Sequence, residues 1–404
     1  MSTRAIAMEL SSADGVQLLS LPALVGFYFA ARFSITYLFF QADPQQGAAV
    51  GTALNLVLLV AVAFYSFGPS SSTLKWMLHA RPFRWVLVFL GFALCSLFWS
   101  ETVSVATALV YWSALAADVV IVVLLLRTGP IDQRAATLIK GFVCGACFIA
   151  CAMWVSPTLQ DLRPGNDDFF TPNAIGYICA IGVFLAQFLS RSERIWRWLA
   201  VFLAISLLRT LSKTTIAAFI AGELLLLFRD TTIRRRSKVL IVLSALLVLV
   251  AFSGLIADYY VVYTNAGNQA ETLTGRIGIW AFVLNRAFDH PWFGHGFHSF
   301  WNVIPPFGNF EAWHAHNDAV QQFYTYGVAG IVLLLGLYGS LYRQLRHVSS
   351  PPIKTLFLSL LVFFVVRGFA DTENFEPSFP LWCITLVTLL LAHLQRMTQK
   401  EVLQ

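Results

Sequence analysis

Long apolar segments recur along this chain, and they limit its possible folds more than any other feature. Each segment is long enough, or nearly so, to cross the roughly 30 Å hydrocarbon core of a bilayer as a helix. Inside a bilayer such a segment has to be helical, because a helix satisfies its own backbone hydrogen bonds. We therefore predict an all-α, polytopic transmembrane bundle of about twelve helices, over the approximate ranges 21–40, 50–67, 84–100, 103–126, 137–156, 173–190, 197–211, 214–228, 239–257, 318–341, 355–370 and 380–395.

The composition excludes an ordinary soluble domain. Of the 404 residues, 58% are hydrophobic and only 12% are charged, and the mean hydropathy is +0.70. No internal repeat or linker divides the sequence, so we interpret residues 1–404 as a single integral membrane domain. The first apolar segment follows about twenty more polar residues and lacks a small-residue cleavage site, which favours a retained helix over a signal peptide.

Basic residues alternate between the connections and thereby predict the orientation. Most of the 27 Lys and Arg residues fall in every second connection, counted from the N-terminus, and short cytoplasmic loops hold such an excess. The other connections are acidic instead, at Asp43, Glu101, Asp161, Asp167, Asp168, Asp371, Glu373 and Glu376. We therefore expect both termini to be cytoplasmic. The net charge of +6 indicates orientation rather than a nucleic-acid partner.

Seven basic residues lie outside those connections. A cation within the bilayer is unfavourable by at least about 2.5–3.5 kcal/mol, so one placed there usually has a partner or a function. We expect Arg32 to extend its charge to the headgroups, whereas Arg209 and Lys213 lie four residues apart on one helix face at the outer surface. Asp118 and Glu223 also fall inside predicted spans, in a structural or a functional role. The seven are Arg32, Arg163, Arg209, Lys213, Arg276, Arg286 and Arg367.

The chain concentrates its polar chemistry in one predicted outer loop, residues 258–317. Five of the eight histidines lie there, at positions 290, 295, 298, 314 and 316. Gly275 to Phe288 has the pattern of a short amphipathic helix lying on the membrane surface. We favour an ordinary interfacial role for His290, His295 and His298. Two further polar segments, 161–168 and 371–376, are either solvated loops or contacts for sugar hydroxyls.

Three motifs in this loop resemble those of one membrane-enzyme family. They are Thr274-Gly-Arg276-Ile-Gly-Ile-Trp280, His290-Pro-Trp-Phe-Gly-His-Gly296 and His314-Ala-His-Asn-Asp318. In order and spacing they resemble the O-antigen ligase and Wzy-type polysaccharide polymerase family, with its Gly-Arg-xxx-Trp helix, Pro-xx-Gly-x-Gly turn and His-Asn segment. Phe98-Trp-Ser100 and Ser212-Lys213-Thr214 are similar too. Ligase members usually have Arg at position 213, so the chain looks more similar to the exopolysaccharide-polymerase branch.

The resemblance implies a fold, a reaction and a location. It implies a GT-C-like, metal-independent, inverting glycosyltransferase of a bacterial inner membrane, with a catalytic loop at 258–317 that faces the periplasm. The donor would be an undecaprenyl-pyrophosphate-linked oligosaccharide, and the acceptor a growing exopolysaccharide or O-antigen glycan. The alternative is an O-antigen ligase of lipopolysaccharide biosynthesis, which transfers the glycan to lipid A-core. A flippase or exporter of the same lipid-linked sugars is the alternative of another class.

The required chemistry suits these residue types. A pyrophosphate leaving group departs with negative charge, which Arg209, Lys213 and Arg276 would stabilise without a metal or another cofactor. His316 is our candidate base for the acceptor hydroxyl, with Asn317 or Asp318 fixing its tautomer. Lys213 and Arg276 share the catalytic role with His316. Further donor and acceptor contacts are expected from Arg209, Arg286, Arg367, His314, Asn317 and Asp318.

A metal site is the competing interpretation of the last motif. His314, His316 and Asp318 alternate in a way that would present two imidazoles and a carboxylate together. The chain lacks the Asp-x-Asp pair of metal-dependent nucleotide-sugar transferases, and the family it resembles is not metal-dependent. We therefore expect no metal, and our predicted partners are the lipid-linked donor, the acceptor and membrane lipids, with no nucleic acid.

Overall fold

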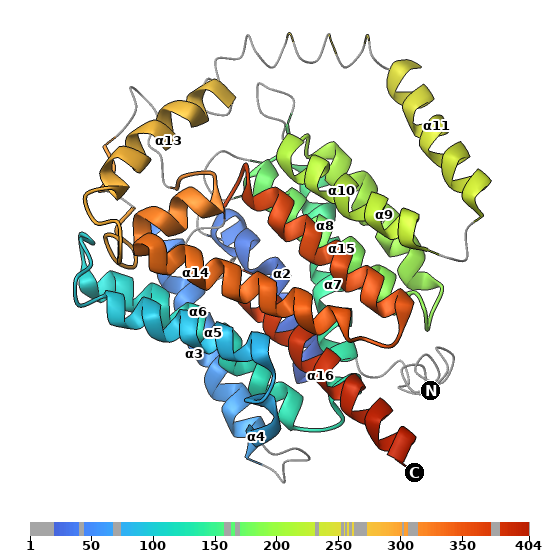
Figure 1. The fold of residues 1–404 in the computed structure, drawn as a ribbon, viewed down its shortest axis with the longest axis horizontal. Helices are drawn as coiled ribbons and strands as arrows, with labels where there is room; N and C mark the ends of the chain where they lie inside the picture. Colours follow the sequence, from blue (N-terminus) through green and yellow to red (C-terminus); the bar gives the residue numbers. More distant parts are fainter. Residues whose placement is uncertain are drawn as a thin grey trace.

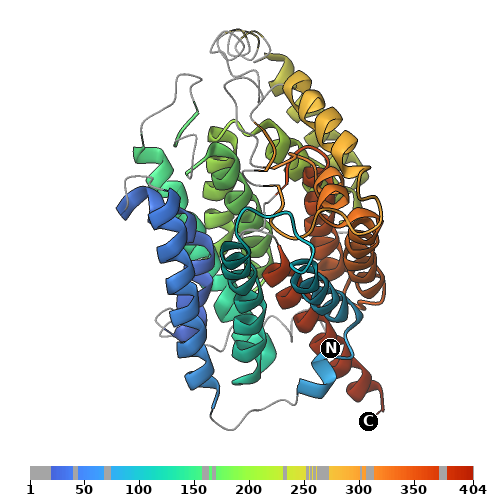
Figure 2. The same ribbon diagram turned by 90° about the vertical axis from the view of Figure 1, so that its left-hand side faces the viewer.

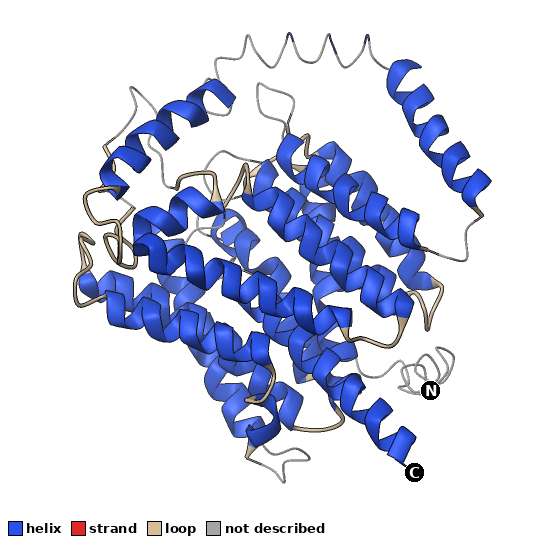
Figure 3. Cartoon of the chain, in the orientation of Figure 1, coloured by secondary structure: helices blue, strands red, loops and turns tan. Residues whose placement is uncertain are grey.

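The computed structural model describes most of the chain. The described residues are 20–39, 44–67, 74–156, 163–165, 170–230, 234–251, 254, 257, 261, 273–300, 303–305, 314–372 and 380–403. Their regular elements are helices (Figures 1 and 3). Parts of the predicted polar loops lie outside the described residues, namely Asp43, Asp161, Asp167, Asp168, Glu373 and Glu376, together with much of the loop 258–317.

Every predicted apolar segment overlaps one helix of the structure. The helices are α2 (Leu21–Phe39), α3 (Pro44–Ser66), α5 (Arg81–Ser96), α6 (Val105–Arg127), α7 (Ile131–Val155), α8 (Pro172–Leu189), α9 (Ile195–Arg209), α10 (Lys213–Arg229), α11 (Arg235–Ala251), α14 (Asp318–Arg346), α15 (Pro351–Gly368) and α16 (Leu381–Leu403). A short α4 (Leu74–Met77) was not predicted, whereas α13 (Leu273–Ala287) is the expected amphipathic helix.

Length and composition identify several of these helices as capable of crossing a membrane. Within the described residues six qualify, namely α6, α7, α8, α14, α15 and the 381–399 part of α16. Shorter apolar stretches occupy Leu21–Arg32 of α2 and Val50–Tyr65 of α3. The chain is therefore a helical, multi-pass membrane protein. Twelve crossings, like the orientation, stay a prediction.

Small residues let α2 and α7 approach closely. A Cβ atom added to Gly141 of α7 would lie 1.9 Å from the carbonyl oxygen of Ala23, and one added to Gly26 of α2 would lie 2.0 Å from that of Leu138. Gly141 and Gly145 are four residues apart, the spacing that lets transmembrane helices pack backbone to backbone. A larger residue at these glycines would force the two helices apart.

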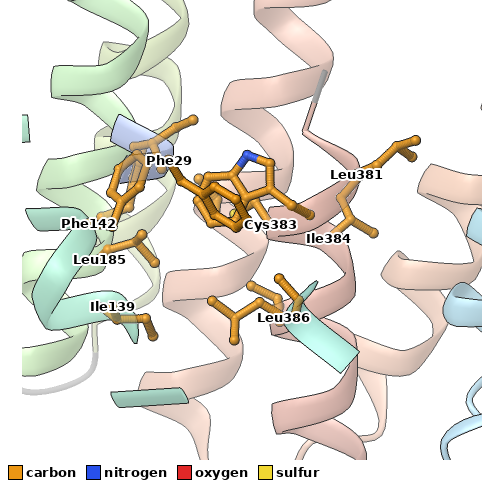
Figure 4. Close-up of a cluster of buried hydrophobic side chains, with 14 of the residues drawn as sticks. Phe29, Ile139, Phe142, Leu185, Leu381, Cys383, Ile384 and Leu386 are labelled. Atoms are coloured by element: carbon orange, nitrogen blue, oxygen red, sulfur yellow. The ribbon is translucent and has the colours of Figure 1, made fainter. Parts of the chain in front are cut away.

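An aromatic cluster joins distant parts of the sequence in the core. Trp382 of α16 packs against Phe29 of α2 and Phe142 of α7, with ring centroids 5.1 Å apart in both pairs. Figure 4 shows these two phenylalanines among aliphatic side chains of the same cluster. Aromatic pairs of this kind contribute roughly 0.5–1.5 kcal/mol each beyond their buried area. The cluster thus joins the first and last helices of the described bundle.

A buried ion pair joins α2, α3 and α6. Arg32 Nη1 lies 2.8 Å from Asp118 Oδ2, and Asn55 Nδ2 donates to Asp118 Oδ1 at 3.0 Å. All three side chains are buried. The expectation that Arg32 extends to the headgroups is therefore wrong, because a carboxylate on a helix far away in sequence satisfies its charge inside the bundle.

The basic connections gather at one end of the bundle. Lys140 Nζ lies 2.9 Å from Glu193 Oε1, which joins α7 to the α8–α9 connection, and Arg191 Nη2 donates to the carbonyl of Pro352 at 2.7 Å. The α8–α9 and α14–α15 connections are therefore neighbours, as strict alternation of helix direction requires. The C-terminus lies toward this end, and α13 lies at the opposite end (Figure 2).

The ion pair generates a stability prediction. We expect Asp118→Ala to lower the free energy of unfolding by about 3–5 kcal/mol, because it leaves the Arg32 charge buried and unpaired. Thermal unfolding in detergent micelles would measure the loss. The double variant Arg32→Met with Asp118→Leu is the control, since it removes both charges and should recover much of the stability. A single variant as stable as the parent would contradict the prediction.

Candidate functional site

Helix ends from four elements meet at the end of the bundle that carries α13. Arg276 of α13 donates through Nη1 to Thr214 Oγ1 of α10 at 3.3 Å and also to the carbonyl of Ala370, just after α15. Asn317, the N-cap residue that precedes α14, donates through Nδ2 to the carbonyl of Phe369 at 2.8 Å. These contacts fasten α13 and the start of α14 to the ends of α10 and α15.

We call the place where the ends of α10, α13, α14 and α15 meet the junction. Asp371 contacts several of its polar side chains. Its Oδ1 lies 3.3 Å from His316 Nδ1 and 3.7 Å from His314 Nε2, while its Oδ2 accepts from Arg367 Nη2 at 3.0 Å. The rings of His314 and His316 are 4.1 Å apart between centroids, and the Arg367 guanidinium lies 4.2 Å from the centre of the Tyr177 ring. One carboxylate thus contacts a buried arginine and both histidines of the last motif.

The electrostatics favour an ionised Asp371 and a neutral His316. Burial alone would raise the pKa of Asp371, but the Arg367 charge and hydrogen bonds from both histidines hold that pKa well below its usual range. For His316, burial and the neighbouring His314 lower the pKa to about 4, against the opposing effect of Asp371. At neutral pH the imidazole is therefore uncharged and able to accept a proton.

The same contact fixes the tautomer of His316. An ionised carboxylate only accepts hydrogen bonds, so the proton of the neutral ring must be on Nδ1, and the lone pair of Nε2 is available. Asn317 instead caps α14, since its Oδ1 accepts from the Val320 amide at 3.0 Å. Asp371, not Asn317, therefore holds the His316 ring. His316 also has a φ of 50°, a left-handed conformation that is uncommon outside glycine.

The Ser-Lys-Thr segment at the start of α10 uses its hydroxyls to bind neighbouring helices. Ser212 Oγ donates to Asn173 Oδ1 of α8 at 2.7 Å and lies 2.9 Å from Thr215 Oγ1. Thr215 Oγ1 in turn accepts from Arg367 Nε at 3.4 Å. Lys213 is exposed in the first turn of α10, next to the residue that contacts Arg276. A helix N-terminus and an ammonium group together favour an anion.

The helix α14 has a break, and the Pro-xx-Gly-x-Gly turn supplies the backbone hydrogen bonds that the break leaves unmade. In this sense the turn repairs α14. Gly327 interrupts that helix with φ 62° and ψ −150°, so the next two amides cannot bond to the helix carbonyls. The amides of Val328 and Ala329 donate instead to the carbonyls of Pro291 and Trp292, at 2.8 and 3.2 Å. The carbonyls of Tyr324 and Thr325 accept from the amides of His295 and Gly296, at 3.0 and 2.8 Å.

The turn also binds the Phe98-Trp-Ser100 segment. Ser100 Oγ donates to the carbonyl of Phe297 at 2.6 Å, and the amide of Phe297 donates to Ser96 Oγ at 2.9 Å. A Cβ atom at Gly296, where φ is 88°, would lie 2.5 Å from Ser100 Cα. Two motifs that lie about 190 residues apart in sequence therefore form one structural unit.

The other three histidines of the loop lie in or next to this turn. His295 is buried, stacks on Tyr324 with ring centroids 4.4 Å apart, and has Nε2 3.0 Å from the carbonyl of Arg286. His298 stacks on Tyr111, and burial lowers its pKa to about 4. His290 is exposed. His295 and His298 are therefore packed inside the protein, and only His290 has the exposure that the expected interfacial role implies.

Not every candidate residue lies at the junction. Arg276, His314, His316, Asn317 and Arg367 do, and so does Asp318, whose carboxylate packs against Gly368. Arg209 instead lies over the Trp154 ring, with 5.6 Å to its centre. Arg286 is ten residues beyond Arg276, about 15 Å along the α13 axis. The sequence alone places Asp371 only in a polar loop, because residue spacing does not show which helix ends meet.

A small cavity lies among the described residues beneath the junction. A cavity of about 10 Å³, lined by Asp318, Arg367, Tyr177, Tyr338 and others, has room for about one water molecule. This cavity is therefore too small to hold a large substrate.

Metal ligation is a geometric possibility at the histidine pair. The ligand atoms of His314, His316 and Asp371 lie within 4.8 Å of one another, so the expected set with Asp318 is corrected to one with Asp371. Arg367 is already paired with that carboxylate, and the charge of Arg276 also acts on His316. Both cations oppose a metal ion there.

Comparison with known proteins identifies the central part of the chain. The sequence model of the O-antigen ligase family matches residues 198–335. The resemblance to the O-antigen ligase family is confirmed. Exopolysaccharide production protein ExoQ of Rhizobium meliloti (strain 1021) is 25% identical over 334 residues, which cover 73% of this chain and 73% of that protein. Together they support a membrane glycosyltransferase of the O-antigen ligase and polysaccharide polymerase type.

The segment matched to O-antigen ligases contains part of the junction. Lys213, Arg276 and His316 lie within residues 198–335, and so does the turn that repairs α14. Arg367 and Asp371 lie beyond it and join the site only through the fold. Three of the candidate residues therefore lie inside the matched segment, whereas Asp371 lies outside it and contacts His316 only because of the fold.

The break at Gly327 in α14 leads to a prediction about thermal stability. We expect Gly327→Ala to lower the melting temperature by several degrees, because only glycine adopts this φ and ψ readily and the new Cβ would lie 2.5 Å from the carbonyl of Pro291. The matched control is Gly339→Ala in the same helix, where a Cβ meets nothing within 4 Å. That change should be neutral or stabilising by up to about 1 kcal/mol. Equal melting temperatures for the two variants would contradict the prediction.

Proposed function

We propose that this chain is a metal-independent, inverting glycosyltransferase that polymerises repeat units carried on undecaprenyl pyrophosphate. The observation that supports it most is the neutral His316, oriented by Asp371, beside the buried cation Arg276. A base and a fixed positive charge are the two groups that glycosyl transfer from a pyrophosphate requires. The polymer would be exopolysaccharide or O-antigen.

Arg276 and Lys213 are suited to bind the leaving group. Arg276 is mostly buried, and its Nε has no hydrogen-bond partner among the described residues, so a donor remains for a phosphate oxygen. Arginine binds phosphate in bidentate fashion, whereas lysine adds a compact point charge. Lys213 supplies that charge in the first turn of α10. Arg367 acts differently, since its charge is paired with Asp371 and so orients the base.

The proposed step is a single displacement. The acceptor hydroxyl oxygen bonds to the anomeric carbon as the bond from that carbon to the pyrophosphate oxygen breaks. His316 Nε2 takes the hydroxyl proton, and undecaprenyl pyrophosphate leaves with its negative charge held by Arg276 and Lys213. Attack from the face opposite the leaving group inverts the anomeric centre. We expect His314 to contact sugar hydroxyls, whereas the Asn317 side chain caps α14 and Asp318 is buried.

Two observations favour polymerisation over ligation to lipid A-core. Position 213 is Lys, in a Ser-Lys-Thr segment that looks more similar to the exopolysaccharide-polymerase branch. The matched relative is named an exopolysaccharide production protein. A flippase should distribute its charges along a path through the membrane. In the described residues Arg276, His314, His316, Arg367 and Asp371 instead gather at one end.

The distribution of charged residues between the two ends of the bundle also supports a proposed location. We infer a bacterial inner membrane protein whose basic connections and both termini are cytoplasmic and whose junction faces the periplasm. Short cytoplasmic loops hold an excess of Lys and Arg. The junction lies at the end of the bundle away from those connections, on the side where the proposed lipid-linked donor would be exposed. Membrane lipids surround the helices.

A defined substrate tests the proposal. Purified protein is incubated with an undecaprenyl-pyrophosphate repeat unit, without added metal, and products are followed by gel and mass spectrometry. We expect extension of the repeat unit and at least about a hundredfold loss of rate in His316→Ala. Lys213→Arg, which keeps the charge, should retain most of the activity. Product only with lipid A-core would establish the ligase, and no product with either acceptor would favour the flippase.

The pH profile tests the base. The active form of His316 is deprotonated, and its pKa is lowered to about 4, so the rate should stay constant from pH 8 to about 5.5 and fall as the pH drops through about 4. An unperturbed histidine would lose activity through about pH 6.5 instead. His314→Gln removes a neighbour that lowers the pKa, so its acid limb should move upward. An acid limb at 6.5 in both proteins would contradict the lowered pKa of His316.

A further inference from the structure

A second group of ligand-type side chains lies away from the junction, at the turn that repairs α14. It consists of Glu101, His290 and His295, which we call the clasp site. His295 Nδ1 lies 2.9 Å from Glu101 Oε2, and His290 Nε2 lies 3.5 Å from Glu101 Oε1. The two imidazole rings are 4.9 Å apart and nearly perpendicular. The ligand atoms all lie within 4.8 Å of one another.

A hydrogen bond determines which ring nitrogen of His295 carries a hydrogen. Its Nε2 is 3.0 Å from the carbonyl oxygen of Arg286, which can only accept, so Nε2 carries a hydrogen. In the neutral ring Nδ1 is then a bare lone pair that faces the carboxylate of Glu101. Two acceptors 2.9 Å apart repel each other unless a positive species lies between them.

The environment of Nδ1 points to a metal ion as that species. His295 is 2% exposed, and its Nδ1 has no hydrogen-bond partner among the described residues despite the nearby carboxylate. A third ligand atom, His290 Nε2, approaches the same carboxylate. Metal-binding histidines commonly donate their other ring hydrogen to a backbone carbonyl, as His295 does to Arg286. A proton would satisfy one pair of atoms, whereas a cation satisfies all three.

We propose that Glu101, His290 and His295 bind a divalent cation of the zinc class. Two imidazole nitrogens and one carboxylate form a common zinc ligand set. Glu101 and His290 are exposed, which leaves room for water as the fourth ligand. The site is independent of the proposed glycosyl transfer, and its role is structural.

The cation would join three segments that the fold brings together. Glu101 belongs to the α5–α6 connection, and its amide already donates to the carbonyl of His295 at 2.9 Å. His290 and His295 belong to the turn that completes the backbone of α14. Through the carbonyl of Arg286 the site also reaches the end of α13, the helix that carries Arg276. Metal binding would thereby stabilise the position of α13.

Metal content and stability test the proposal on the intact protein. The chain is purified in detergent without chelator, and bound metal is measured by inductively coupled plasma mass spectrometry. Thermal unfolding is then followed after EDTA treatment and after addition of zinc chloride. We expect about one zinc per chain, a lower melting temperature after EDTA, and recovery with zinc. His290→Gln and Glu101→Gln should lower zinc affinity more than about tenfold.

Matched variants separate this site from others. His290→Cys, which supplies another zinc ligand, should retain the metal, and the exposed His347→Gln should behave as the parent. His314→Gln tests the histidine pair at the junction and should leave the metal content unchanged. The proposal is overturned if zinc neither binds nor raises the melting temperature. It is also overturned if His290→Gln and Glu101→Gln keep the metal, or if His314→Gln loses it.

Discussion

Buried polar groups need partners in this largely apolar bundle, and that constraint explains the main features of the structure. Water is scarce between the helices, so a backbone amide or a charge that leaves one bond has to find another within the protein. Arg32 forms an ion pair with Asp118, and Arg367 forms one with Asp371. The backbone amides that lose their helix bonds after Gly327 donate to the turn that begins at Pro291. The Arg32–Asp118 pair and the bonds at the α14 break connect segments that are distant in sequence.

The candidate site is a consequence of the same constraint. Arg367 needs an anion, and Asp371, once ionised beside it, becomes the acceptor that orients His316. Burial then keeps the imidazole uncharged, which is the state a general base requires. Arg276 lies nearby, and its Nε has no hydrogen-bond partner among the described residues. A neutral base beside a partly unsatisfied cation suits the glycosyl transfer that we propose for this chain.

Much of the architecture was predictable because apolar length and helix periodicity are local properties. Each expected segment overlaps a helix, and the amphipathic pattern after Gly275 is α13. Arg32 looks like a lone cation in the sequence, because its partner Asp118 is 86 residues away, and the expectation for Arg32 is therefore wrong. Likewise Asn317 follows His316 directly in sequence, yet it caps α14 and Asp371 takes the place expected of it.

The sequence by itself determined the class of the protein, the helical segments, and the motifs that contain Lys213, Arg276 and His316. Those follow from composition, periodicity and residue order. Only the tertiary structure decided which of the candidate cations approach the histidines, which carboxylate fixes the tautomer of His316, and why the Pro-xx-Gly-x-Gly turn lies against α14. The physical reason is that electrostatics and hydrogen bonding act over a few ångströms, whereas the groups involved are separated by tens to hundreds of residues.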